Sequence, residues 1–222
     1  MQVNTLVDKI ANIVGEPDYT TSNIITSINT AQISISAGGS RPHRMPKVAP
    51  LPGLLTSGEV ALLDSARIVN LPSDYQRNVL MIIDDTEEIP IIDSYIDYIK
   101  AYPTLTVGQP AYCLIRGRSL YYSPSYSKNI TVHYYRKPVT VETGDDIDIS
   151  IPEGLQDALI VSFCCADFFS RTEDEEGDRK NHTSFWKNQH YEALTNLERE
   201  IGTAERRSIT ISDNTSTRII SF

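Results

Sequence analysis

The chain has 222 residues, of which 40% are hydrophobic and 22% are charged, and its formal net charge at pH 7 is -9. This composition is that of an ordinary globular protein and excludes a disordered or collagen-like chain. A protein that grips duplex DNA neutralises phosphates with clustered Lys and Arg, so the acidic balance disfavours general DNA binding, and we expect nearby duplex to be repelled.

The first 37 residues carry the pattern of two helices. Apolar residues recur every three or four positions from Val3 to Val14 and again from Ile24 to Ile35. Gly15 ends the first helical pattern, and Thr20, Thr21 and Ser22 are N-cap candidates for the second helix. The sequence therefore predicts an N-terminal helical pair over residues 1–37.

Residues 38–59 contain four prolines, at positions 42, 46, 50 and 52, which exclude regular secondary structure over most of this segment. Loops of this length inside a compact domain are commonly functional. We therefore predict an extended Pro-rich loop that contacts a neighbouring protein. The side chains predicted to make this contact are Arg41, Arg44, Lys47, Leu51 and Leu54.

In residues 60–142 the pattern of apolar residues becomes that of β-strands. Short runs rich in Val, Ile and Tyr are separated by Asp, Ser and Pro. Strands are predicted at 60–63, 66–71, 79–83, 88–92, 111–115, 119–123 and 129–135, and a short helix at 93–101. We expect one small antiparallel sheet of about five to seven strands, inserted between helices.

Residues 143–202 predict a second helical pair. Pro152 and Glu153 suit the first turn of a helix, and Thr183 or Ser184 is predicted to cap a last helix. The apolar residues of the earlier helix wrap most of its circumference. Either this helix is central in the protein, or one face contacts a neighbouring subunit through Ile160, Phe163, Cys164 and Phe168.

Residues 203–222 have no helical stripe, and apolar residues alternate with Ser and Thr. Such a segment adds a strand to the sheet edge of another protein. We predict an extended C-terminal arm that docks on a partner through Ile209, Ile211, Ile220 and Phe222. The predicted fold class is thus α+β: a helical bundle of about four helices with an inserted small antiparallel β domain and an extended C-terminal arm.

The residues that could act in catalysis or bind a metal are not arranged in any recognised motif. The sequence therefore predicts no catalytic site, no cofactor and no metal. The four histidines lack metal-ligand spacing, and Cys164 and Cys165 lie in a Phe-rich helix where a buried thiol is inert. Phosphate-binding and nucleophile-elbow motifs are absent. The N-terminal residues lack a continuous apolar run, and no segment reaches membrane-span length, so we expect a cytosolic chain without a membrane partner.

Two tyrosine pairs leave an alternative function open. The rings of Tyr121-Tyr122 and Tyr134-Tyr135 would suit stacking on single-stranded nucleic acid. More often such strand tyrosines place one ring in the core and the next at the surface. A nucleic-acid-binding module is therefore the runner-up, and an enzyme with an unrecognised site comes third.

Six segments, taken in their order along the chain, carry a family resemblance. They are NIITSINTAQISIS, ARIVNLPSDYQR, VGQPAYCLIRGRSLYYSP, ITVHYYRKP, IPEGLQDALIVSFCCADFFSRTEDEEGD and FWKNQHYEALTNLEREI. In this order and spacing they resemble the head-to-tail adaptor proteins of tailed bacteriophages, although no one segment is a signature. The resemblance covers most of the chain except 38–58 and the tail after Gly202.

This resemblance implies a helical bundle with an inserted β domain, no catalysis, and self-assembly into a ring, commonly dodecameric, at the neck of the virion. It implies a portal protein above the ring, with the C-terminal arm docked on it, and tail, stopper or nozzle proteins below. DNA would pass through the lumen without specific binding. The Pro-rich loop is where this sequence departs from the family.

Overall fold

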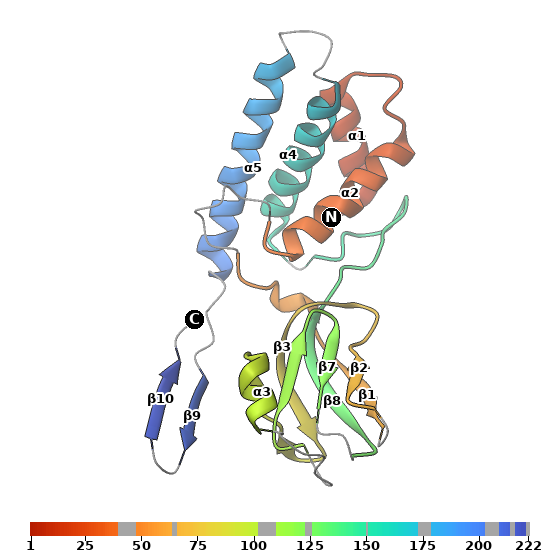
Figure 1. Ribbon diagram of the computed structural model, residues 1–222. Helices are drawn as coiled ribbons and strands as arrows, with labels where there is room; N and C mark the ends of the chain where they lie inside the picture. The colour runs from red at the N-terminus through yellow and green to blue at the C-terminus, as the bar shows by residue number, and fades with distance from the viewer. Residues whose placement is uncertain are drawn as a thin grey trace. The chain divides into compact units, whose positions relative to one another are not determined.

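The computed structural model describes residues 1–39, 48–63, 66–101, 110–122, 126–149, 151–172, 179–202, 209–213 and 216–220 (Figure 1). The chain divides into two compact units. The first, here called the bundle unit, joins Met1–Leu54 to Lys137–Glu205, and the second, the strand unit, joins Leu55–Arg136 to Arg206–Phe222. The fold is mixed α+β, which confirms the predicted fold class.

Four helices form the bundle unit: α1 (Val3–Val14), α2 (Thr21–Ser36), α4 (Glu153–Thr172) and α5 (Arg179–Ile201). Helix α4 packs against each of the other three (Figure 1). Its buried residues lie all around the helix, as its sequence predicted. Of the two alternatives left open by the sequence, the structure therefore shows a central helix.

Local signals in the sequence set the ends of the first two helices. Gly15 closes α1 in the left-handed region, with φ 68°, and its N–H donates to the carbonyl of Ala11 at 2.9 Å. The Thr20 hydroxyl caps α2 by accepting from the N–H of Asn23 at 3.4 Å. Both ends agree with the sequence prediction.

The segment before α4 that contains Val141 and Asp145 forms hydrogen bonds to α1 and α2. The carbonyl of Asp145 accepts from the N–H of Val3 at 2.9 Å, which satisfies one of the free amides at the first turn of α1. The side chain of Asn29 on α2 pairs with both backbone groups of Val141, at 2.9 and 3.0 Å. This segment therefore connects α1 to α2 through hydrogen bonds.

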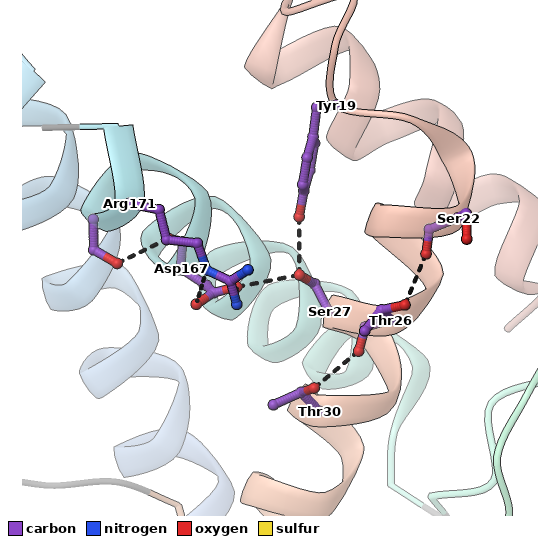
Figure 2. Close-up of polar contacts among 8 residues, drawn as sticks. Tyr19, Ser22, Thr26, Ser27, Thr30, Asp167 and Arg171 are labelled. Carbon is purple, nitrogen blue, oxygen red and sulfur yellow. Dashed lines mark hydrogen bonds and ion pairs between the residues drawn. The ribbon is translucent and has the colours of Figure 1, made fainter.

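A second polar network joins α2 to α4 (Figure 2). The Tyr19 hydroxyl donates to Ser27 Oγ at 2.9 Å, and Ser27 Oγ donates to Asp167 Oδ2 at 3.2 Å. Arg171, one turn further along α4, forms a bidentate ion pair with Asp167, with contacts of 2.7 and 3.1 Å. The carboxylate of Asp167 thus links a buried hydroxyl to an exposed guanidinium.

Two four-stranded sheets form the strand unit, where the sequence predicted one. The first has the order β1 (Leu55–Leu62), β8 (Lys128–Arg136), β3 (Tyr75–Asp84) and β4 (Glu87–Glu88), all antiparallel. The second has the order β2 (Ile68–Asn70), β7 (Ser119–Tyr121), β6 (Cys113–Arg116) and β5 (Ile91–Ile92). The β5–β6 pair is parallel. A short helix, α3 (Tyr95–Ala101), follows β5.

Pro90 explains why the predicted strand at 88–92 is divided between the two sheets. Ile89 still belongs to the first sheet, because its N–H donates to Ile82 at 2.8 Å. Pro90 has no N–H, and its carbonyl instead accepts from Cys113 of the second sheet at 2.9 Å. The chain therefore changes sheets at this proline.

Both sheets contribute to one core, which contains Tyr122 among its largest fully buried side chains. Gly58 of β1 makes room for another of its rings, since a Cβ there would lie 3.2 Å from the hydroxyl of Tyr134. The remaining members are Val60, Leu62, Leu71, Tyr75, Val79, Ile82, Ile89, Cys113, Leu120, Ile130 and Val132. Two sheets that share one core make a small sandwich.

Several element ends differ from the sequence prediction. A 3-10 turn at Pro52–Leu54 and the start of β1 at Leu55 lie inside the predicted loop 38–59, because β8 is long enough to pair with β1 as far as Tyr135. Helix α5 begins at Arg179, so Thr183 is buried within the helix instead of capping it. The predicted arm contains two strands, β9 (Ile209–Asp213) and β10 (Ser216–Ile220), which pair as a hairpin.

Candidate interaction surface

Helix α3 is attached to the strand unit by one of its tyrosines. Tyr98 is buried, and its hydroxyl donates to the carbonyl of Tyr122 at 2.7 Å. Burial raises the pKa of Tyr98 to about 12, so the hydroxyl remains a donor at neutral pH. The helix is thus held from one side by a single buried side chain.

Helix α3 also leaves large apolar side chains exposed. Tyr95, Ile96 and Ile99 on the helix, with Ile68 on β2, are between 44% and 65% exposed. Tyr121 joins the two groups, because it pairs with Ile68 across the sheet and its ring lies 6.1 Å from that of Tyr95. These five residues form a continuous patch, here called the α3 surface. Patches of this kind mark interaction sites.

Two arginines flank the α3 surface. The guanidinium of Arg116 lies 5.6 Å above the centre of the Tyr95 ring, a cation–π contact. Arg67 directly precedes Ile68, and its charge acts on the Tyr98 hydroxyl. Among the described residues, neither arginine forms an ion pair. The surface therefore combines aromatic, aliphatic and positive groups, the residue types enriched in protein interfaces.

The turn between β3 and β4 gathers negative charge in the same unit. Asp84 is only 3% exposed, and the Lys128 ammonium lies 2.8 Å from its Oδ1. Lys128 also pairs with Asp85, and the Tyr126 hydroxyl donates to Asp84. Burial alone would raise the pKa of Asp84, but the bonds from Lys128 and Tyr126 lower it below its ordinary value. Residues 84–88 are here called the acidic hairpin.

The predicted docking residues of the C-terminal arm lie on the β9–β10 hairpin, with one exception. Its register pairs Ile209 with Ile220 and Ile211 with Arg218. Phe222 lies outside the described residues. Ile209 and Ile220, two of the predicted docking residues, are therefore neighbours across a two-stranded ribbon.

The predicted intersubunit face of the central helix requires a correction. Ile160, Cys164 and Phe168 are buried by the chain's own bundle, because α4 has helices on three sides. Phe163 alone of the four is half-buried, and its ring lies 5.5 Å from that of His190 on α5. Of these four residues, Phe163 alone keeps side-chain surface that a second chain could contact without opening the bundle.

The predicted loop contacts fall into two groups. Arg41, Arg44 and Lys47 lie outside the described residues. Leu51 and Leu54 are each 1% exposed, so neither offers surface to a partner. Within the described part of this loop, the two predicted leucines are therefore covered by the chain itself.

The tyrosine pairs divide between core and surface. Tyr122 and Tyr134 are buried, and each hydroxyl has a partner: Tyr122 bonds to both backbone groups of Leu63, and Tyr134 donates to Asp74 at 2.6 Å. Tyr121 and Tyr135 are half-buried. Because two of the four rings are inaccessible, the sheet is a poor platform for stacked bases.

One arrangement could be taken for a nucleophile and its base. Ser162 Oγ lies 3.2 Å from Nδ1 of His190, but the hydroxyl also donates to backbone carbonyls of α4, and both side chains are buried. A nucleophile that no substrate reaches does no chemistry, so this pair joins α4 to α5. Burial also raises the pKa of Cys113 and of Cys165 to about 12, which leaves both thiols unreactive.

Within the described ranges, no group of three or more His, Cys, Asp or Glu side chains could hold a metal ion. In the same part of the chain, no helix is long and apolar enough to cross a membrane.

Sequence reasoning predicted α3 as a helix but did not identify its outer face as a site. The signal was present, since Tyr95, Ile96 and Ile99 are three apolar residues in a helix of seven. A helix this short buries one side only, so apolar residues all around it indicate an uncovered face.

Comparison with known proteins places the chain in a family. The family model described as SU10 adaptor protein matches residues 1–216, which include both units and most of the hairpin. No curated protein matches the chain. The head-to-tail adaptor resemblance inferred from the segments is thereby confirmed, and the chain belongs to the SU10 adaptor protein family.

Proposed function

We propose that this protein is a structural component of the virion that forms a ring at the neck, between the portal and the tail, stopper or nozzle proteins. The match to an adaptor family along nearly the whole chain carries this proposal. Further support comes from the α3 surface, which offers apolar contact area beyond what the chain buries itself. Binding, without turnover of a substrate, is the proposed activity.

The C-terminal hairpin is the proposed attachment to the portal. A two-stranded ribbon has an unpaired edge on each side, and such edges pair with strands of other proteins. Ile209, Ile211, Ile220 and Phe222 would supply the apolar side chains of this contact. Isolated hairpins are marginally stable, so docking on a partner would also stabilise the ribbon.

The acidic balance of the chain suits the passage of DNA through a ring. With a formal charge of -9 per copy, repeated subunits would give the assembly a strongly negative field. Phosphates are repelled by such a field, so duplex DNA would slide without being held. The twelve-fold stoichiometry implied by the resemblance remains part of this proposal.

The experiment is complementation of a phage whose own copy of the gene is inactivated. A chain that ends at Gly202 should leave the bundle folded, by circular dichroism, while filled heads lack the adaptor in electron micrographs. A finer variant, Ile209→Ser with Ile220→Ser, removes one apolar pair that the register places side by side. Its matched control, Ser212→Ala with Thr217→Ala, changes the polar pair three positions along.

We expect the isoleucine variant to lose attachment and the control to keep it. Heads that carry the adaptor in normal amounts after removal of residues 203–222 would refute the docking role of the arm. Wild-type protein that joins no particle at all would refute the adaptor function.

A further inference from the structure

We propose that the α3 surface binds the acidic hairpin of a second copy of this chain. This inference rests on the proposed function, because it supplies the contact that would repeat around the ring. Neither feature has a role within the single chain that accounts for its exposure. The α3 surface leaves Ile96 65% exposed, and the acidic hairpin leaves both residues of β4, Glu87 and Glu88, exposed.

Charge complementarity points to this occupant. The acidic hairpin holds four carboxylates, Asp84, Asp85, Glu87 and Glu88, against the single ammonium of Lys128, which leaves a formal charge of -3. Glu87 and Glu88 form no ion pair among the described residues.

The α3 surface carries the opposite sign. Arg67 and Arg116 outweigh Asp93, and the charges of Asp97 and Lys100 on α3 cancel. Opposite charges that are unpaired in the single chain form ion pairs when two copies meet. Contact between two α3 surfaces would instead bring Arg116 near its own copy, so a symmetric pairing is disfavoured.

The hairpin is held in shape before any partner arrives. Asp84 is buried and bound by Lys128 and Tyr126, which come from β8 and the segment before it. Asp85 takes φ 53°, and the register joins Asp84 to Glu87 across the turn. Side chains and backbone that are already fixed lose little entropy on binding, so such a turn makes an efficient ligand.

Both surfaces belong to one compact unit, so each copy presents them at a fixed relative position. A copy that donates its hairpin to one neighbour still offers its α3 surface to another. Head-to-tail contacts of this kind close into a ring when the rotation between copies permits. The geometry within one unit is therefore that of a repeating contact, in which apolar residues supply area and charges set the orientation.

The contact is tested by mixing two variants, each with one introduced cysteine, under mild oxidation. One chain carries Glu87→Cys on the hairpin, and the other carries Ile96→Cys on the α3 surface. The three native thiols are buried and do not compete. The matched control replaces Ile96→Cys with Lys187→Cys, an exposed position on α5. We expect several-fold more heterodimer from the first mixture than from the control.

Charge reversal gives a second measurement. Arg116→Glu in the Ile96→Cys chain should reduce the cross-linked yield, and Glu88→Lys in the Glu87→Cys chain should restore it. Yields equal to the control, or no response to either reversal, would overturn the contact. The same holds if a labelled oligothymidylate binds the wild-type chain through Arg116 while cross-linking stays at the control level, because the surface would then be a nucleic-acid site.

The two proposals fail in different ways. If the wild-type protein forms rings on portal-bearing heads but the cysteine pair does not cross-link above the control, this contact is wrong and the adaptor function stands. If the pair cross-links and responds to charge reversal, yet the protein joins no particle, the contact stands and the adaptor function is wrong.

Discussion

The network around Asp167 allows the contributions of a buried hydroxyl and an exposed ion pair to be compared at one carboxylate. Asp167→Ala removes the acceptor of Ser27, which is buried, and also the partner of Arg171. A hydrogen bond to a charged group contributes about 1.5–3 kcal/mol, and an exposed ion pair about 0.2–1 kcal/mol. Alanine regains about 0.5 kcal/mol of helix propensity.

The expected loss of unfolding free energy for Asp167→Ala is therefore about 1–3.5 kcal/mol. Arg171→Ala removes only the ion pair, whose side chains are 25% and 72% exposed, and should cost about 0.5 kcal/mol or less. Salt should weaken the effect of Arg171→Ala and leave most of the effect of Asp167→Ala.

Urea unfolding measures both variants through Trp186, the single tryptophan, which lies on α5 in the same unit. A variant Ser27→Ala completes the comparison, because Asp167→Ala in that background should cost little more than the ion pair. If Asp167→Ala is no more destabilising than Arg171→Ala, the buried bond contributes nothing and the reasoning is refuted.

Gly39→Ala should lower the free energy of unfolding by about 1–3 kcal/mol in the same urea assay, because the added Cβ would lie 2.7 Å from Leu194 and the backbone φ is +71°. The control is Gly154→Ala, which should not destabilise the protein because the space around Gly154 is open. The pKa of Asp84 is lower in the folded protein than in the unfolded chain, so the ionised carboxylate stabilises the fold above about pH 4. This stabilisation is lost as the pH falls below that value. In the Asp84→Asn variant, the urea midpoint measured by circular dichroism should therefore depend less on pH in this acidic range. Tyr98→Phe should cost about 0.5–1.5 kcal/mol by circular dichroism, and an unchanged midpoint would contradict its role in holding α3.

The helices of the bundle were predictable because their signals are local. Gly15 and Thr20 fix helix ends within a few residues of sequence, and the apolar residues around α4 indicate a helix covered on several sides. The same residues misled the site prediction. Ile160 and Cys164 would look alike in sequence whether their own bundle or a second chain buried them.

The sheets depended on contacts between distant segments and were predicted only in part. Individual strands follow from the alternation of residue types, but the parallel pairing of Ile91 with Cys113 joins segments that no local pattern connects. Pro90 marked the break in retrospect, since a residue without an N–H interrupts a ladder. Exposure of the α3 surface likewise depends on what the fold leaves uncovered.

The salt dependence of the proposed contact should separate the roles of its two kinds of residue. Charges act at a distance of about 8 Å at physiological ionic strength, so Arg67, Arg116 and the acidic hairpin would guide two copies together. Apolar burial at Ile96 and Ile99 acts only on contact and is not screened. Added salt should therefore slow association of two copies while leaving dissociation nearly unchanged, whereas Ile96→Ser should speed dissociation at any salt concentration. A contact held by charge alone would instead dissociate faster as salt rises.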